Sequence, residues 1–245
     1  MVFSAIQFFV TTLLAIVCAQ SIEVTQGNVP VLALAIPALW IYSRSRASGI
    51  FLLAGLCLYG FTLPYQATAL SVSMWILFPL LMVAFSRRSN ASVRLCVFGF
   101  FLFMQSGIIY SQYVGVLQGE AVYTMLQIVS IAMIWLAAVS WKTSSKHGWW
   151  ALFLTIPLFA ADMAHAALIS LTIVAIMASL EHMVQARSKW LKLQCWTLPT
   201  AAFASLVALP SGGKVQSIVL LVWLLILASI WMTDYILRVN EEIGE

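Results

Sequence analysis

Long apolar runs, each about as long as a lipid bilayer is thick, alternate along the chain with short polar connections. A transmembrane helix needs about 20 apolar residues. The run from 148 to 186 is too long for one ordinary helix, and we divide it into two. The predicted spans are residues 2–20, 29–43, 47–63, 68–86, 95–113, 121–140, 148–164, 167–186, 194–209 and 216–237. The pattern therefore predicts an all-α polytopic transmembrane bundle of about ten spans, in a single membrane domain covering residues 1–245.

Composition supports a membrane location. The chain is 63% hydrophobic and 8% charged, whereas a soluble domain carries roughly 25% charged residues. With so few charges, the chain cannot cover a water-facing surface, so we expect the lipid bilayer to be its main partner. Helices are the default way to span because each satisfies its own backbone hydrogen bonds. The alternation typical of barrel strands is absent from the sequence.

The basic residues predict the orientation. They gather in short clusters between apolar runs, as in cytoplasmic loops. With both termini in the cytoplasm, only Lys214 of the twelve Lys and Arg residues falls outside. The clusters are Arg44 and Arg46; Arg87, Arg88 and Arg94; Lys142 and Lys146; and Arg187, Lys189 and Lys192. We expect a multi-pass inner (plasma) membrane protein with cytoplasmic N- and C-termini. Because this charge lies in loops, it does not indicate nucleic-acid binding.

The first span and the cysteines resemble targeting or ligand motifs only superficially. The segment "MVFSAIQFFVTTLLAIVCAQS" has no basic n-region, and Val17 before Cys18 fits a lipoprotein site poorly, so we expect a retained first span. None of the four cysteines forms a C-x-x-C pair, so we expect neither a disulfide framework nor a metal site. The sequence has no phosphate-binding glycine loop, and we expect no cofactor.

Residues 1–120 and 121–240 show a partial internal repeat. At an offset of 120, "VFSAIQ" (2–7) aligns with "VYTMLQ" (122–127), "LALAIP" (32–37) aligns with "LFLTIP" (152–157), and Pro79 aligns with Pro199. A copy of five spans inserts upside down relative to the first, which gives the inverted repeat found in secondary transporters. The alternative is chance similarity between apolar segments, since proline is also tolerated in membrane helices.

Ten spans, both termini inside, short loops and a 5+5 inverted repeat resemble the drug/metabolite transporter superfamily, including its EamA-type members. The segments that carry the resemblance are "LALAIP" and "LFLTIP" with the matched prolines. The resemblance implies a solute site near the bilayer midplane between the two halves. No family motif fixes site residues, so none is assigned from the resemblance.

Asp162 and His165 are the first candidates for a substrate or coupling site. Three residues apart, they share one face if a helix continues through residue 165. They would then form a proton-coupled or substrate-binding pair at an outer vestibule, because His165 can change charge near neutral pH. The alternative, which we prefer, is a polar turn facing water, since Asp162 lies about 20 Å along a helix that starts near Trp149.

Other polar residues are further candidates. Gln105, with Ser106 beside it and Tyr110 further along, either links helices or lines a path for a solute. Asp234 lies four residues before Arg238, which predicts an i,i+4 ion pair or, alternatively, a proton-carrying carboxylate. Glu181 and His182 are expected at a solvated interface.

We prefer a permease that moves a small solute. The second hypothesis is a non-catalytic membrane subunit that assembles with a partner protein. The third is an intramembrane enzyme, which would need a buried cluster around Asp162 and His165. The chain has only His147, His165 and His182 as histidines and no H-E-x-x-H or G-x-S-x-G motif, so a catalytic role is the least favoured.

Overall fold

Every apolar run that the sequence predicts as a span is helical in the computed structural model. The structure describes residues 2–42, 46–86, 89–141, 148–186, 188, 190–210 and 214–244, and these ranges contain no β-strand. The elements are α1 (Val2–Val24), α2 (Val31–Tyr42), α3 (Arg46–Thr62), η1 (Leu63–Tyr65), α4 (Thr68–Ser73), η2 (Met74–Ile76), α5 (Leu77–Ala84), α6 (Ala91–Tyr113), α7 (Ala121–Ser140), η3 (Trp149–Leu154), α8 (Thr155–Ala160), α9 (Ala164–Gln185), α10 (Trp190–Ala208) and α11 (Ser217–Gly244). The predicted all-α class is confirmed for these residues.

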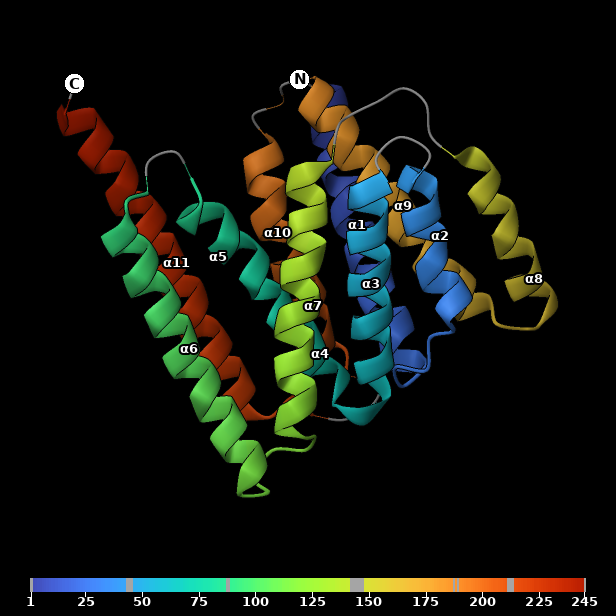
Figure 1. The fold of residues 1–245 in the computed structure, drawn as a ribbon, viewed down its shortest axis with the longest axis horizontal. Coiled ribbons are helices and arrows are strands. Elements are labelled where there is room, and N and C mark those ends of the chain that lie inside the picture. Colours follow the sequence, from blue (N-terminus) through green and yellow to red (C-terminus); the bar gives the residue numbers. More distant parts are fainter. Residues whose placement is uncertain are drawn as a thin grey trace.

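Successive segments run in opposite directions, and both chain termini lie at the same end of the bundle, here called the terminal end (Figure 1). Among the described basic residues, Arg46 begins α3, and Arg94 and Lys192 lie in the first turns of α6 and α10 at the terminal end. Lys214 belongs to the connection between α10 and α11, at the opposite end. The other residues of the predicted clusters lie outside the described residues: Arg44, Arg87, Arg88, Lys142, Lys146, Arg187 and Lys189. Positive charge in the described chain is therefore concentrated at the terminal end.

Six helices of the described chain are long and apolar enough to cross a membrane: α1, α3 with η1, α6, α7, α9 and α11. The segments Val31–Tyr42, Thr68–Ala84 and Trp149–Ala160 are apolar but shorter. Large apolar side chains on the outside of the bundle are exposed, such as Leu95 at 76% and Phe103 at 70%. A surface of this kind is suited to lipid and not to water.

Two of the predicted spans are irregular. The span predicted at 68–86 is α4 and α5 joined by the 3₁₀ turn η2, and Pro79 occupies the first turn of α5, where proline costs no helical hydrogen bond. The span predicted at 148–164 is the 3₁₀ helix η3 followed by the short helix α8. The predicted start of the next span at 167 was three residues late, because α9 begins at Ala164.

The packing of the long helices determines where the interior lies. α1 packs against α9 and α10, α3 packs against α7 and α2, and α6 packs against α11. The broken segment α4–η2–α5 lies among these helices, with Ser71, Met74 and Ile76 almost fully buried. Small residues allow close contacts, since a Cβ on Gly60 would stand 2.1 Å from Leu34 Cδ1 of α2. Helices that approach this closely fix the shape of the space enclosed between them.

Candidate functional site

A cavity of about 250 Å³ lies between the helices of the two sequence halves. From residues 1–120, α1, α2, α3 and the broken segment α4–η2–α5 contribute to its wall, and from residues 121–240, α7, α9 and α10 do. Its lining extends from Ile41 and Trp141, at the terminal end, to Val29 and Leu63, towards the opposite end. The cavity therefore occupies the interface between the halves over much of the length of the bundle.

Three aromatic rings form one part of the wall. The rings of Tyr59 and Trp75 pack edge to face, with their centroids 5.6 Å apart and an interplanar angle of 76°. Trp75 also stacks on Phe78, at 6.2 Å and 28°. The Tyr59 hydroxyl donates a hydrogen bond of 2.8 Å to the carbonyl oxygen of Ser71, which holds the ring of α3 against α4. This aromatic group is therefore fixed in orientation by packing and by a hydrogen bond.

A buried amide makes a hydrogen bond to Ser71, the same residue that Tyr59 contacts. Gln127 of α7 is fully buried, and its Nε2 donates to Ser71 Oγ at 2.8 Å. The link joins α7 to α4 at the residue whose carbonyl oxygen accepts from Tyr59. Hydrogen bonds between helices are a common source of association in membranes. In the aligned segments 2–7 and 122–127, Gln127 corresponds to Gln7, whose Nε2 donates to the Ser179 carbonyl oxygen of α9 at 3.1 Å.

A close backbone contact lies at the end of the cavity furthest from the termini. Gly27 has φ +76°, and a Cβ at this position would stand 2.6 Å from the Leu63 carbonyl carbon. Only glycine adopts this conformation without strain and leaves room for Leu63. Val29, two residues on, and Leu63 both line the cavity. The connection after α1 therefore packs directly against the first residue of η1.

The chemistry of the wall is uniform. Among the described residues, none with a charged side chain lines the cavity, and its polar side-chain groups are the Tyr59 hydroxyl, the indoles of Trp75 and Trp141 and the thiols of Cys18 and Cys195. None of the six candidate residues predicted from the sequence lines it. Those candidates lie elsewhere in the fold.

Asp162 lies on the turn between α8 and α9, and His165 lies in the first turn of α9. α8 ends at Ala160 and α9 begins at Ala164, so no helix runs continuously from Asp162 to His165. Asp162 has φ +59°, and both side chains are exposed. Neither side chain has a hydrogen-bond or ion-pair partner in the described part of the chain, and the buried cluster that an intramembrane enzyme would need does not form around them there. This arrangement agrees with the turn interpretation and lacks the continuous helix that the pair requires.

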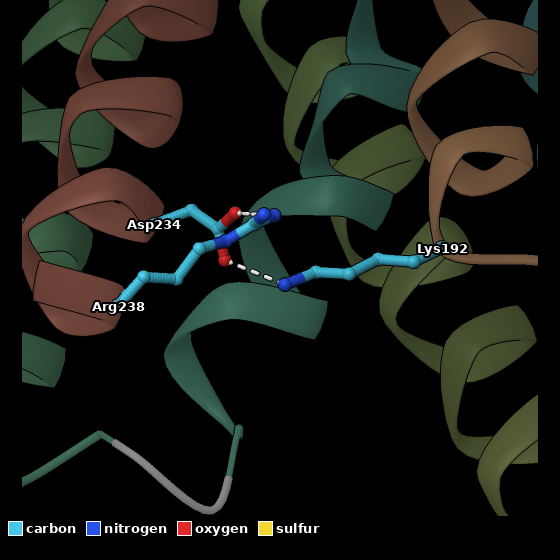
Figure 2. A network of polar contacts seen from close by, with 3 residues as sticks. All are labelled: Lys192, Asp234 and Arg238. Atoms are coloured by element: carbon cyan, nitrogen blue, oxygen red, sulfur yellow. Dashed lines mark hydrogen bonds and ion pairs between the residues drawn. The ribbon is translucent and has the colours of Figure 1, made fainter. Parts of the chain in front are cut away.

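Asp234 links two helices at the terminal end (Figure 2). Its carboxylate accepts a 2.9 Å hydrogen bond from Lys192 Nζ of α10 and also pairs with the Arg238 guanidinium one turn along α11. The predicted i,i+4 pair is therefore present, and Lys192 is a partner that sequence spacing did not indicate. Figure 2 shows the lysine side chain reaching past the end of α5 towards the carboxylate. The Asp234 side chain is 13% exposed, and its two cationic partners are 47% and 50% exposed.

The three candidates on α6 have different surroundings. Gln105 is buried, faces α11 and lines a space of about 10 Å³ with Ser73 and Trp223. Ser106 is exposed and donates to the Phe103 carbonyl oxygen at 2.7 Å, and Tyr110 is 69% exposed. α6 therefore does not present the three side chains to one common path.

Glu181 and His182, both predicted at a solvated interface, differ in exposure. His182 is exposed, as a solvated interface requires. The same prediction is wrong for Glu181, which is 4% exposed. Gln185 Nε2, one turn along α9, donates to its carboxylate at 3.4 Å. His147 lies outside the described residues.

Comparison of the chain with models of protein families, with curated proteins and with solved structures finds no match. The cavity and its lining therefore carry the functional argument.

Proposed function

We propose that this protein is a multispan permease that moves a small solute across the cell inner membrane through the cavity between its two halves. The observation that carries the proposal is the cavity of about 250 Å³, to which helices from residues 1–120 and from residues 121–240 both contribute. Solute sites of secondary transporters lie at such a repeat interface.

The helix contacts support an inverted duplication of five spans. Under the offset of 120 residues, the pair α3 and α7 corresponds to α9 and α1, and both pairs pack closely. The pair α1 and α10 corresponds to α7 and the broken segment α4–η2–α5, which also pack. The pair α2 and α3 corresponds to α8 and α9, and both pairs pack. The offset exchanges α6 and α11, which pack against each other. The correspondence is incomplete. α2 packs against α9, whereas α8 and α3 do not pack to a comparable degree. α11 packs against the broken segment α4–η2–α5, whereas α6 and α10 do not pack to a comparable degree.

The sequence markers of the repeat lie in corresponding segments. Pro37 is inside α2 and Pro157 is inside α8, while Pro79 is inside α5 and Pro199 is inside α10. The concentration of positive charge at the terminal end favours a cytoplasmic position for both termini. With halves of opposite orientation, the same cavity can open first to one side of the membrane and then to the other.

Two-sided access to a thiol in the cavity tests the proposal without knowledge of the solute. Cys195 lines the cavity and is half-buried, and the other three cysteines can be replaced by Ala. We expect a small membrane-impermeant methanethiosulfonate to modify Cys195 in right-side-out and in inverted vesicles. A matched control keeps only Cys96, which is exposed on α6 and lies outside the cavity.

Modification of Cys195 from one side only, or from neither, would overturn the permease proposal. If Cys195 is not modified from both sides and a stoichiometric partner co-purifies with the protein, the membrane-subunit hypothesis is favoured instead.

A further inference from the structure

The wall of the cavity excludes charged solutes. Within the described residues it contains no Asp, Glu, Lys, Arg or His, and the hydroxyl of Tyr59 already donates to Ser71. An ionised carboxylate or ammonium group in such surroundings loses its hydration and gains no counter-charge, so its binding is strongly disfavoured. A neutral solute avoids this cost.

The size of the cavity limits the solute further. A cavity of ~150 Å³ with an apolar wall stays dry and accepts one benzene molecule. The present cavity, at about 250 Å³, is larger by roughly a second ring. The cavity therefore has room for a fused two-ring solute.

The aromatic group Tyr59, Trp75 and Phe78 provides a recognition surface for rings. Aromatic pairs in edge-to-face or offset-stacked geometry are stabilised beyond the burial of their area. The edge-to-face and stacked contacts already present hold these three rings in place, so a bound ring meets an ordered surface. The oxygen of Tyr59 has two lone pairs, so beside its contact with the Trp75 side chain it has acceptor capacity for a solute hydroxyl or N–H group.

We propose that the cavity binds one uncharged, predominantly apolar solute with a fused aromatic ring system and a neutral hydrogen-bond donor, and that it rejects organic anions and cations of the same size. This inference rests on the proposed permease function, because it names the class of solute that the permease would carry. The ring packs against Tyr59, Trp75 and Phe78, and the donor reaches the Tyr59 oxygen.

Calorimetric titration of the purified full-length protein in detergent tests this inference. The probes are 2-naphthol, which is neutral, and the anion 2-naphthoate and the cation 2-naphthylmethylammonium, which share its ring system. We expect saturable one-to-one binding of 2-naphthol above the background of empty micelles, and no saturable binding of either ion.

Two variants on one helix locate the site. Ala202 of α10 lines the cavity, whereas Ala204, two residues on, is exposed outside it. Filling the cavity by Ala202→Phe is expected to weaken 2-naphthol binding by about tenfold or more, and Ala204→Phe is expected to leave it within about twofold. Thermal unfolding of both variants shows that each is folded.

The inference is overturned by equal binding of a charged probe, by no saturable binding of 2-naphthol, or by equal effects of the two variants. These outcomes are independent of two-sided access to Cys195. Binding of 2-naphthol with one-sided access retains the site and rejects the permease, whereas two-sided access without binding retains the permease and rejects this solute class.

Discussion

Gly55 of α3 lies so close to Ile134 of α7 that a Cβ atom on the glycine would stand 2.7 Å from Ile134 Cγ1. The same Cβ would also stand 3.0 Å from the Ser130 carbonyl oxygen. α3 and α7 belong to different halves, and small residues let membrane helices approach closely. Ile134 and the neighbouring Leu56 line the cavity, so this contact also determines part of its shape.

Gly55→Ala is expected to destabilise the protein by about 1–3 kcal/mol, because the added methyl group must displace Ile134 or separate the two helices. The control is Gly99→Ala on α6, where a Cβ meets no atom within 4 Å. Alanine is the better helix former by ~1 kcal/mol, so the control should be neutral or slightly stabilising. Equal stabilities of the two variants in thermal or denaturant unfolding would contradict the close contact.

The segments could be predicted from the sequence because span length and apolar composition are local properties. The irregular ones could not, since η2 begins at Met74, before Pro79, and is buried among other helices. Tertiary packing has set the backbone geometry there. The turn at Asp162 was placed only approximately, because the apolar run continues through it and only the positive φ of Asp162 marks the reversal.

The cavity could not be predicted from the sequence because its wall is chemically similar to the lipid-facing surface. Ile173 of α9 lines the cavity, whereas Leu221 of α11 is 56% exposed, and nothing in the two side chains separates these positions. Polar residues were the available signal, and the six candidate residues do not line the cavity. Asp234 is an example. Its spacing from Arg238 predicted an i,i+4 ion pair, with a proton-carrying carboxylate as the alternative, and the further partner Lys192 comes from another helix.

The ion-pair network of Asp234 is expected to stabilise the terminal end modestly. Since Lys192 and Arg238 are about half exposed, at 47% and 50%, solvent screens the attraction, and Asp234→Asn should cost at most about 1 kcal/mol. The loss should shrink as salt is added. Unfolding of Asp234→Asn, Lys192→Met and the double variant across a salt series measures the coupling. A salt-independent loss of several kcal/mol would show that the carboxylate has another role.

Topology can be tested directly. Reporter fusions at residues 45, 90, 144 and 190 are expected to report cytoplasm, because basic residues surround these positions. Fusions at 28, 117 and 162 are expected to report the opposite side, since these connections lie at the other end of the bundle. Periplasmic signals at two or more of the first four positions would reverse the proposed orientation.

Replacing Asp162 or His165 is expected to have little effect. Asp162→Asn keeps a residue that tolerates a positive φ, and His165→Gln changes an exposed side chain, so each should remain within ~0.5 kcal/mol of the parent protein. Asp162→Val places a β-branched residue at φ +59° and should cost about 1–2 kcal/mol. Unfolding measurements separate the three. If Asp162→Asn instead removes a pH dependence of transport, the residue couples protons and the turn interpretation fails.

The rate at which N-ethylmaleimide modifies Cys195 should depend on whether the cavity is occupied. Cys195 lines the cavity and Cys96 is exposed outside it, so the ratio of their modification rates corrects for reagent that partitions into detergent or lipid. Saturating 2-naphthol is expected to lower this ratio several-fold, because a bound ring excludes the reagent from the wall beside Cys195. The ratio should stay unchanged with 2-naphthoate, which the uncharged wall rejects, and in Ala202→Phe, where the added ring already fills the space. Mass spectrometry of the peptides containing each cysteine gives both rates from one sample. An unchanged ratio with 2-naphthol in a protein that binds it by calorimetry would place the bound ring away from Cys195.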